Sequence, residues 1–308
     1  MLRGLARVVP PGDLTVVVNT GDDDEFYGLH VSPDVDTILY TLAGLAPLER
    51  GWGIEGDTFT VRDELDTVAG RGWFALGDRD LATHILRTQR LREGATLSAV
   101  TAELARARGI NIRVLPMSDA PVRTIIGTDS GDLAFQEYLV KKRARPAVRS
   151  VRYTGARKAT PAAGVLEAIA KSNLVIIAPS NPFVSIGPML AVPGIRKELA
   201  AARDRVVAVS PLIGGRAIKG PLASMLRSMG HGATVAAIAA LYRKVAATLV
   251  VAPGDGDADV AHGVNLLEHD ILLLDPKRAE TLVHYLLSRK EHAASPRPTT
   301  KAPRRIQA

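Results

Sequence analysis

The chain has 308 residues and a formal net charge of +7, and 46% of its residues are hydrophobic although only 4% are aromatic. A chain of this length and composition can bury a large, mostly aliphatic core, as one large domain or two small ones. It contains no cysteine. Disulfides and thiolate metal sites are therefore excluded, and any metal would need oxygen or imidazole ligands.

The positive charge is concentrated in two segments. Residues 141–158 carry eight positive charges and no acid, and the tail 292–308 carries four, so the rest of the chain is net negative. The first segment could bind nucleic acid, but no nucleic-acid motif accompanies it, and a solvated loop or a phosphate-facing surface is the simpler interpretation. The tail is rich in Pro, Thr and charge, which predicts disorder.

No segment has the pattern of an export signal or a membrane span. The first thirteen residues contain no long apolar run. The most apolar window, 233–253, is interrupted by Arg243 and Lys244, and we expect it to form a helix followed by a buried strand. These patterns favour a cytoplasmic protein.

Short apolar runs predict strands along the chain, and helical patterns lie between them. The runs are 14–18, 112–116, 173–179, 205–211, 248–253 and 270–275; helical spacing appears over 2–9, 36–45, 80–94, 96–109, 160–172 and 192–204. This alternation predicts an α/β fold with a Rossmann-like, mostly parallel sheet and helices on both faces. Residues 1–291 should form a single domain.

One region departs from the alternation. The segments 122–129 and 133–140 flank the sequence Ser-Gly-Asp and predict a β-hairpin. Together with helices between residues 55 and 109, this hairpin predicts an insertion or cap over the sheet at about residues 50–160.

The first predicted strand runs directly into clustered acids. Ligands of parallel sheets bind at the carboxyl ends of strands, and Mg²⁺ favours carboxylates together with phosphate oxygens and water. The pattern therefore predicts a magnesium site at Asp22, Asp23 and Asp34, with Asp36 close to it. A solvated loop, with Asp36 as a helix cap, fits the same residues.

Two further loops should converge on this edge of the sheet. They contain small and polar residues, namely Ser180, Asn181, Ser185 and Gly187 in one and Gly214, Gly215, Arg216 and Lys219 in the other. Such loops can direct backbone N–H groups toward an anion, which predicts phosphate or diphosphate contacts; ordinary Gly/Pro loops are the alternative. Neither loop matches the dinucleotide fingerprint or the Walker pattern.

The segment LGDRDLATH, residues 76–84, places three charges at the start of a predicted helix. His84 follows Asp80 by four residues and so shares a helix face with it. An exposed histidine on a capped helix is a simpler interpretation than a catalytic one. The sequence contains no Ser-His-Asp triad pattern and no HExxH metal motif.

Taken together, these stretches resemble the 2-phospho-L-lactate transferase family of coenzyme F-420 biosynthesis. The resemblance rests on VVVNTGDD (16–23), LGDRDLATH (76–84) and APSNPFVSIGP (178–188), among others, and spans most of residues 2–230. Family members transfer a phospholactyl, phosphoenolpyruvyl or phosphoglyceryl group to the ribityl hydroxyl of a deazaflavin, 7,8-didemethyl-8-hydroxy-5-deazariboflavin (Fo). The donor is linked to guanosine diphosphate, as in lactyl-2-diphospho-5′-guanosine, and GMP leaves.

The resemblance implies a Mg²⁺-dependent, homodimeric transferase with these two substrates and no nucleic-acid or membrane partner. It implies a catalytic role for Asp23 and Asp34, metal binding by Asp22, Asp23 and Asp34, and Fo contacts at Asp36 and Arg79. The remaining substrate contacts that it implies, mostly to guanosine diphosphate, are Asn19, Ser180, Asn181, Ser185, Gly187, Gly214 and Lys219. Which hydroxy acid the donor carries stays open.

The sequence departs from the family at its start, where relatives begin with a strand and a GGxGG turn before the first helix. We expect weaker donor binding in a chain without that turn, because its N–H groups would contact a phosphate. Two alternatives to the transferase stay open. A non-catalytic nucleotide-binding regulator with this fold would release no GMP, and a nucleic-acid-binding protein would lose affinity steeply with added salt.

Overall fold

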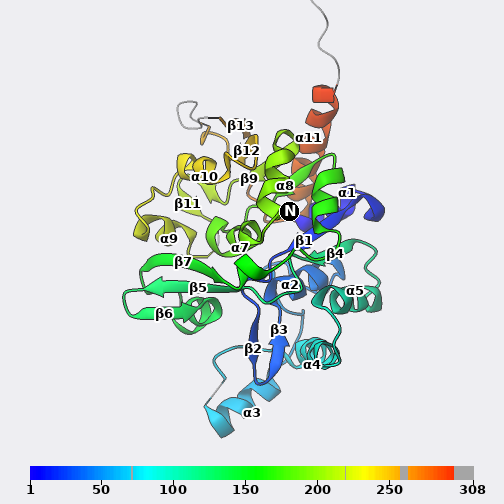
Figure 1. The fold of residues 1–308 in the computed structure, drawn as a ribbon, viewed down its shortest axis with the longest axis vertical. Helices are drawn as coiled ribbons and strands as arrows, with labels where there is room; N and C mark the ends of the chain where they lie inside the picture. Colours follow the sequence, from blue (N-terminus) through cyan, green and yellow to red (C-terminus); the bar gives the residue numbers. More distant parts are fainter. Residues whose placement is uncertain (71, 219, 257–262, 295–308) are drawn as a thin grey trace, which may run out of the picture.

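The computed structural model describes residues 1–70, 72–218, 220–256 and 263–294, and Figure 1 shows the arrangement of its elements. The described helices are α1 (Leu2–Val8), α2 (Pro33–Leu42), α3 (Thr60–Ala69), α4 (Asp78–Arg92), α5 (Leu97–Ala107), α6 (Val165–Lys171), α7 (Gly187–Ala191), α8 (Ile195–Ala201), α9 (Leu222–Ser228), α10 (Val235–Tyr242) and α11 (Pro276–Ala294). The described strands are β1 (Thr15–Val18), β2 (Asp24–Phe26), β3 (Leu29–Val31), β4 (Arg113–Pro116), β5 (Arg123–Thr128), β6 (Gly131–Ala134), β7 (Val148–Thr154), β8 (Val175–Ile177), β9 (Val206–Val209), β10 (Leu212–Ile213), β11 (Arg216–Ala217), β12 (Thr248–Val251) and β13 (Asn265–Glu268).

Parallel strands form the centre of the molecule. A four-stranded sheet has the order β13-β12-β9-β8, with every neighbouring pair parallel, and β1 pairs in parallel with β4. The antiparallel elements are the three-stranded sheet β6-β5-β7 and the hairpins β2–β3 and β10–β11. The predicted α/β fold with a mostly parallel sheet is therefore confirmed.

Helices cover both faces of the four-stranded sheet. Alternate side chains of a strand point to opposite faces. Leu249 and Val251 of β12 belong to a hydrophobic cluster with residues of α6, α8 and α10, whereas Val250 packs with Leu282 and Leu286 of α11. All three β12 side chains are fully buried, as parallel strands covered on both faces require.

The predicted strand at 270–275 is wrong. The strand in this region is β13, five residues earlier, and the apolar run itself is irregular. Asp270 and Asp275 turn the chain, because their carboxylates accept hydrogen bonds from the backbone N–H groups of Leu272 (2.9 Å) and Arg278 (3.0 Å). Ile271 is nonetheless buried against α11, whereas Leu274 of the same run is 65% exposed.

The basic segment 141–158 is not simply a loop, because residues 148–154 of it form β7. This strand pairs with β5 of the predicted hairpin, which the structure confirms as β5–β6. Its outward arginines are paired: Arg149 contacts Asp129 at 2.6 Å, and Arg152 forms an ion pair with Asp132. The second strand of the hairpin is shorter than predicted, since a π-helical segment replaces it at Glu137–Lys141.

Two helix boundaries differ from the sequence prediction. Helix α2 begins at Pro33, after Ser32, so Asp36 lies inside its first turn and is not a cap. Helix α11 continues to Ala294. Residues 292–294 of the predicted tail are thus helical, and residues 295–308 lie outside the described part of the chain.

Helix α3 projects at the bottom of Figure 1 and buries none of its residues. It is joined to α4 by two reciprocal caps. The carboxylate of Asp57 accepts from the backbone N–H groups of Arg79 (2.8 Å) and Asp80 (3.1 Å) at the start of α4. The carboxylate of Asp78 accepts in turn from those of Thr60 and Val61, both at 3.0 Å, at the start of α3. Asp57, just before α3, therefore caps the start of α4, and Asp78, in the first turn of α4, caps the start of α3.

Within the described ranges, no helix combines the length and the apolar character that crossing a membrane would require.

Candidate functional site

Three predicted metal ligands, Asp22, Asp23 and Asp34, form a group that we call the acid cluster. Strand β1 ends at Val18 and delivers Asn19, Asp22 and Asp23 into buried positions. The Asn19 side chain donates from Nδ2 to Asp22 Oδ1 (2.9 Å) and to Asp34 Oδ2 (3.0 Å). One amide group thus ties the loop after β1 to the first turn of α2, and the predicted convergence of these acids is observed.

The remaining partners of the acid cluster come from distant parts of the chain. Gln136 Nε2 donates to Asp22 Oδ2 at 3.1 Å. Ser32 Oγ donates to Asp23 Oδ2 at 2.8 Å, and His30 Nε2 lies 3.1 Å from the same oxygen. Among the described residues, no lysine or arginine forms an ion pair with any of the three acids. Hydrogen bonds from neutral groups and one histidine therefore hold three carboxylates together.

The electrostatics of the acid cluster are unfavourable to three negative charges. Burial raises the pKa of Asp22 well above its usual range, and the carboxylates of Asp34 and Asp23 raise it further. Burial also raises the pKa of Asp23, against the lowering effect of His30 and Ser32. Burial, reinforced by Asp23, raises the pKa of Asp34 to about 6. A cation placed among these oxygens would remove the repulsion.

Two buried oxygens at this place have no hydrogen-bond partner in the structure, Asp23 Oδ1 and Thr20 Oγ1. Buried polar atoms are nearly always paired, so an unpaired one indicates strain, catalysis or a missing ligand. Carboxylate and hydroxyl oxygens are hard donors that suit Mg²⁺. The donor set of Asp22, Asp23 and Asp34 therefore fits a hard divalent cation.

A second group of acids lies between α2 and α4. The ligand atoms of Asp36, Asp80 and His84 lie within 4.8 Å of one another, but this group already contains a cation. Both guanidinium nitrogens Nη1 and Nη2 of the fully buried Arg87 donate to the two carboxylate oxygens of Asp36. His84 Nε2 lies 3.2 Å from Asp80 Oδ2. We call these four residues the Arg87 network.

The loop at 180–187 adjoins the acid cluster, as predicted. Asn19 Nδ2 also reaches the carbonyl oxygen of Val184, at 3.3 Å. Gly21 packs so closely on Pro188 that a Cβ at Gly21 would lie 2.6 Å from the proline ring. Asn181 caps the π-helical segment Pro182–Ile186 by accepting from Phe183 N at 2.9 Å. The first and second predicted loops therefore converge.

The neighbours of the other predicted substrate contacts lie outside the acid cluster. Gly187 packs against Tyr153, since a Cβ there would lie 2.0 Å from the tyrosine hydroxyl. Gly214 forms the β10–β11 turn at φ +55°, and its N–H donates to Asp255 at 2.9 Å. Arg79 is exposed and donates to the carbonyl oxygen of Glu55 at 3.0 Å. Lys219 lies outside the described residues. Ser180 and Ser185 stay predictions without a distinguishing contact.

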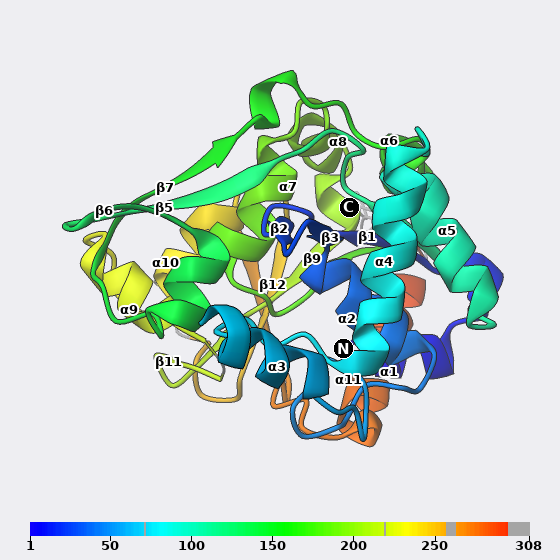
Figure 2. The same ribbon diagram turned by 90° about the horizontal axis from the view of Figure 1, so that it is seen from below.

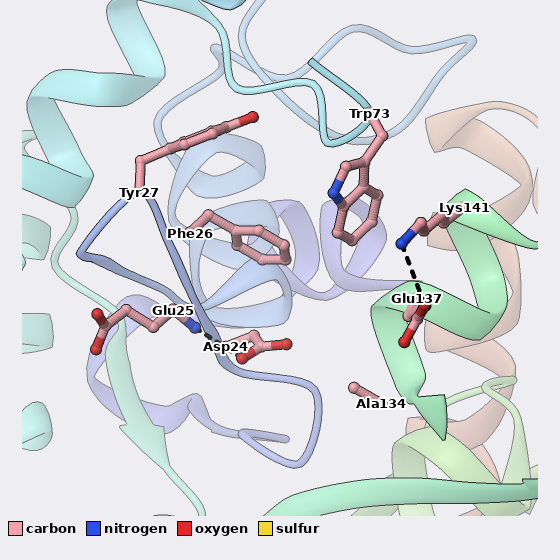
Figure 3. Close-up of a pocket in the computed structure, with 8 residues that line it drawn as sticks. All are labelled: Asp24, Glu25, Phe26, Tyr27, Trp73, Ala134, Glu137 and Lys141. Atoms are coloured by element: carbon pink, nitrogen blue, oxygen red, sulfur yellow. Dashed lines mark hydrogen bonds and ion pairs between the residues drawn. The ribbon is translucent and has the colours of Figure 1, made fainter. Parts of the chain in front are cut away.

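A pocket of about 360 Å³ opens beside the acid cluster, along β2 (Figure 3). We call it the aromatic pocket; its lining residues are Asp24, Glu25, Phe26, Tyr27, Trp73, Ala134, Glu137 and Lys141. Phe26 stacks on Phe74 with ring centroids 3.8 Å apart, and Trp73 meets Phe26 edge to face at 5.5 Å. Lys141 lies 5.7 Å from the Trp73 ring and 3.3 Å from Glu137. Asp24, which lines the pocket, directly follows Asp23 of the acid cluster in the chain.

The residues that orient the acids were not predicted from the sequence. His30, Ser32 and Gln136 lie between 7 and 114 residues from the acids that they contact. The alternation Leu29-His30-Val31 was the one available signal, because it indicates a strand with His30 on the face opposite its apolar neighbours. No local pattern pointed to Gln136.

Residues 1–280 match the sequence model of a protein family, which is described as 2-phospho-L-lactate transferase CofD. The chain belongs to this family. The resemblance seen in the sequence is thereby confirmed, and the protein is a member of a family of transferases of phosphorylated groups. The CofD fold as observed here carries the acid cluster at the end of its first strand.

Individual relatives agree with this membership. A phosphoenolpyruvate transferase of Streptomyces griseus is 47% identical over 246 residues, which cover 78% of this chain and 77% of that protein. A 2-phospho-L-lactate transferase of Methanospirillum hungatei is 37% identical over 289 residues, covering 94% and 95%. The crystal structure of a UPF0052 family protein from Bacillus halodurans has a TM-score of 0.58 at 17% identity, covering 93% and 94%. That last similarity supports the fold alone.

Proposed function

We propose that this CofD family member transfers a phosphorylated hydroxy acid from a guanosine-diphosphate-linked donor to the ribityl hydroxyl of Fo. The observation that carries the proposal is the acid cluster: three adjacent carboxylates, of which Asp22 and Asp23 are buried, without a lysine or arginine partner among the described residues. A family of transferases of phosphorylated groups needs a place where diphosphate charge is neutralised. The acid cluster fits that need through a bound Mg²⁺.

The chemistry of the transfer is a displacement at phosphorus. The ribityl oxygen forms a bond to the phosphorus next to the hydroxy acid, the bond from that phosphorus to the bridging oxygen breaks, and GMP leaves with the bridging oxygen. Bound Mg²⁺ would supply charge neutralisation for the diphosphate. Asp22, Asp23 and Asp34 would hold it.

The protein's own residues orient the reacting groups. Asn19 and Gln136 orient the carboxylates of Asp22 and Asp34 through the hydrogen bonds described above. The half-buried Asp34 would orient the attacking hydroxyl, because a carboxylate within hydrogen-bond reach can accept its proton. The loop at 180–187, which touches Asn19, would face the donor's diphosphate.

Either of two donors is consistent with the relatives. Those named phosphoenolpyruvate transferase reach 47% identity, and those named 2-phospho-L-lactate transferase reach 41% and 37% over more of the chain. We therefore propose the lactyl and enolpyruvyl compounds as the donors to compare first, with the glyceryl compound as a third.

The test is GMP release by the purified protein with Fo, each donor and Mg²⁺, together with the mass of the modified Fo. We expect one GMP for each Fo modified, loss of the reaction in EDTA and its return with added Mg²⁺. Asp204→Asn, at a fully exposed carboxylate, is the control and should behave as the wild type. Full activity in EDTA would overturn the metal assignment. Binding of guanosine diphosphate without any release of GMP would instead favour a non-catalytic regulator.

A further inference from the structure

We propose that a second pocket, lined by residues of β7, α7, α8 and α10, binds a small organic carboxylate with a compact apolar body. We call it the Arg196 pocket; its lining includes Tyr153, Phe183, Leu190, Arg196, Leu241 and Tyr242. None of its lining residues belongs to the acid cluster or to the aromatic pocket. The proposal therefore stands apart from the transfer reaction proposed above.

Tyr242 supplies a buried hydroxyl that has no partner among the described residues. The residue is 1% exposed, and its Oη accepts and donates no hydrogen bond. A polar atom in this position calls for an explanation such as strain or a ligand. The rest of α10 consists of Ala, Val, Ile and Leu, and a phenylalanine would pack in the same place without a hydroxyl to satisfy. Packing thus explains the ring of Tyr242 but not its hydroxyl.

A guanidinium is available at the same end of the pocket. Arg196, on α8, is exposed and forms no hydrogen bond or ion pair with another described residue. Burial raises the pKa of Tyr153 to about 12, and the charge of Arg196 opposes that rise. Burial also raises the pKa of Tyr242, and Tyr153 raises it further. Such effects require proximity, so the guanidinium and the two hydroxyls form one polar end.

A carboxylate matches the donors of this polar end. Arg196 can donate two N–H groups to the two oxygens of a carboxylate, and Tyr242 Oη can donate its proton to the same group. Tyr153 is already engaged, because its hydroxyl donates to the carbonyl oxygen of Phe183 at 2.5 Å. The described lining contains no Asp or Glu that could accept from Arg196 and Tyr242. A ligand would have to supply that acceptor.

The remaining walls of the pocket set the size and character of the ligand's body. They are mostly apolar, with Phe183, Leu190 and Leu241 among them, and the pocket has a volume of about 170 Å³. An apolar cavity of about 150 Å³ can hold benzene. A water molecule could pair with Tyr242, but it would occupy only about 30 Å³ and leave the apolar walls without contacts. The pocket therefore suits a monocarboxylate of about the size of benzoate.

The Arg196 pocket shares a chain segment with the surroundings of the acid cluster. Phe183 and Gly187 line the pocket, and Val184 between them accepts from Asn19 Nδ2 at 3.3 Å. The two sites are nevertheless built from different residues. We therefore expect the carboxylate and guanosine diphosphate to bind at the same time. Any effect of one on the affinity for the other must be equal in both directions.

The experiment titrates para-fluorobenzoate into the full chain and follows it by fluorine NMR. We expect saturable binding, weakened roughly tenfold or more in Arg196→Gln and in Tyr242→Phe, because each variant removes a hydrogen bond to a charged group. The neutral analogue para-fluorobenzamide should bind more weakly by a similar factor. Lys197→Gln is the matched control, since Lys197 is the next residue on α8, is exposed and does not line the pocket.

Thermal unfolding of Tyr242→Phe separates a ligand contact from a structural one. This variant should keep or raise the melting temperature of the ligand-free protein, because the hydroxyl that it removes has no partner among the described residues. A lower melting temperature together with weaker binding would assign the hydroxyl to the fold and overturn its role as a ligand contact.

Binding of para-fluorobenzoate that both variants weaken would establish the site, whether or not the protein releases GMP with Fo. Absence of binding by the wild type would overturn the proposal, and so would binding that either variant leaves unchanged. Equal affinity for the acid and the amide would indicate an apolar cavity that does not recognise an anion. Displacement of para-fluorobenzoate by guanosine diphosphate would assign the carboxylate to the donor site and would equally contradict a separate pocket.

Discussion

The acid cluster and the Arg87 network are two groups of buried acids, one on either side of the first turn of α2, and they differ in one respect. In the Arg87 network a buried guanidinium contacts both oxygens of Asp36. In the acid cluster no arginine or lysine plays that part among the described residues, and the pKa values of all three carboxyls are raised. Figure 2 shows α4, which supplies Arg87, lying alongside α5 and close to α2.

The difference indicates that the two groups of acids have different roles, one structural and one functional. Acids that receive their counter-charge from the chain itself hold α2 and α4 together. Acids that are buried without one make the folded chain less stable until a cation binds, and so are better explained by function. Ligand spacing alone would favour the wrong group, because Asp36, Asp80 and His84 have the closer ligand atoms. The charge already present decides between them.

The largest effect should follow from removing the internal cation. Arg87→Leu leaves Asp36 buried without its partner, which should lower the free energy of unfolding by about 3–5 kcal/mol. Urea denaturation would measure it. The double variant Asp36→Asn/Arg87→Leu should regain part of the loss. Arg149→Leu, which breaks an exposed pair with Asp129, should leave stability nearly unchanged. Equal effects of the two arginine variants would contradict the comparison.

The opposite pattern is expected in the acid cluster. Asp23→Asn removes a buried charge at nearly constant shape, so turnover should fall by roughly 10²-fold or more if a Mg²⁺ contact is lost. The melting temperature of the metal-free protein should stay the same or rise, because the removed charge is buried without a lysine or arginine partner among the described residues and the Asn side chain can still accept the hydrogen bond from Ser32. Steady-state GMP release and thermal unfolding would be measured on the same preparations. An active variant with a lowered melting temperature would reverse the assignment of the two groups.

The smallest effect concerns pH. Burial raises the pKa of Asp34 from 3.8 to about 6 in the folded protein, so the folded state binds this proton more tightly than the unfolded state. The contribution of Asp34 to stability should therefore be fully present below about pH 4 and be lost as the pH rises through about 6. The difference in stability between wild type and Asp34→Asn, measured without metal from pH 4.5 to 7, should change in this direction. A difference independent of pH would show that Asp34 titrates normally.

Much of the fold could be predicted from the sequence, because local patterns determine it. The β-branched run ending at Val18 and the apolar runs at 205–211 and 248–253 became strands of parallel sheets. Residues 270–275 did not, because Asp270 and Asp275 bond to nearby amides and turn the chain. An apolar run indicates burial, but hydrogen bonding of the neighbouring polar residues decides its backbone conformation.

The candidate site could be predicted only in part. Strand ends and clustered carboxylates indicated the acids, which the structure brings together. The charge that distinguishes Asp36 from Asp34 could not be predicted, because Arg87 lies 51 residues from Asp36 and no spacing rule connects them. The aromatic pocket depends likewise on Phe26, Trp73 and Lys141, which meet only in the folded chain.

The reciprocal caps of α3 and α4 have a consequence for how a ligand enters. Because α3 buries none of its residues, separating it from α4 exposes no apolar core and breaks mainly hydrogen bonds that water can replace. Such segments open at a small fraction of the free energy of global unfolding. Trp73 lies between these two helices in the chain, so one wall of the aromatic pocket adjoins a helix that is held mainly by these hydrogen bonds. Amide hydrogen exchange across residues 60–69 would measure how readily α3 separates from α4, independently of any chemistry at the acid cluster.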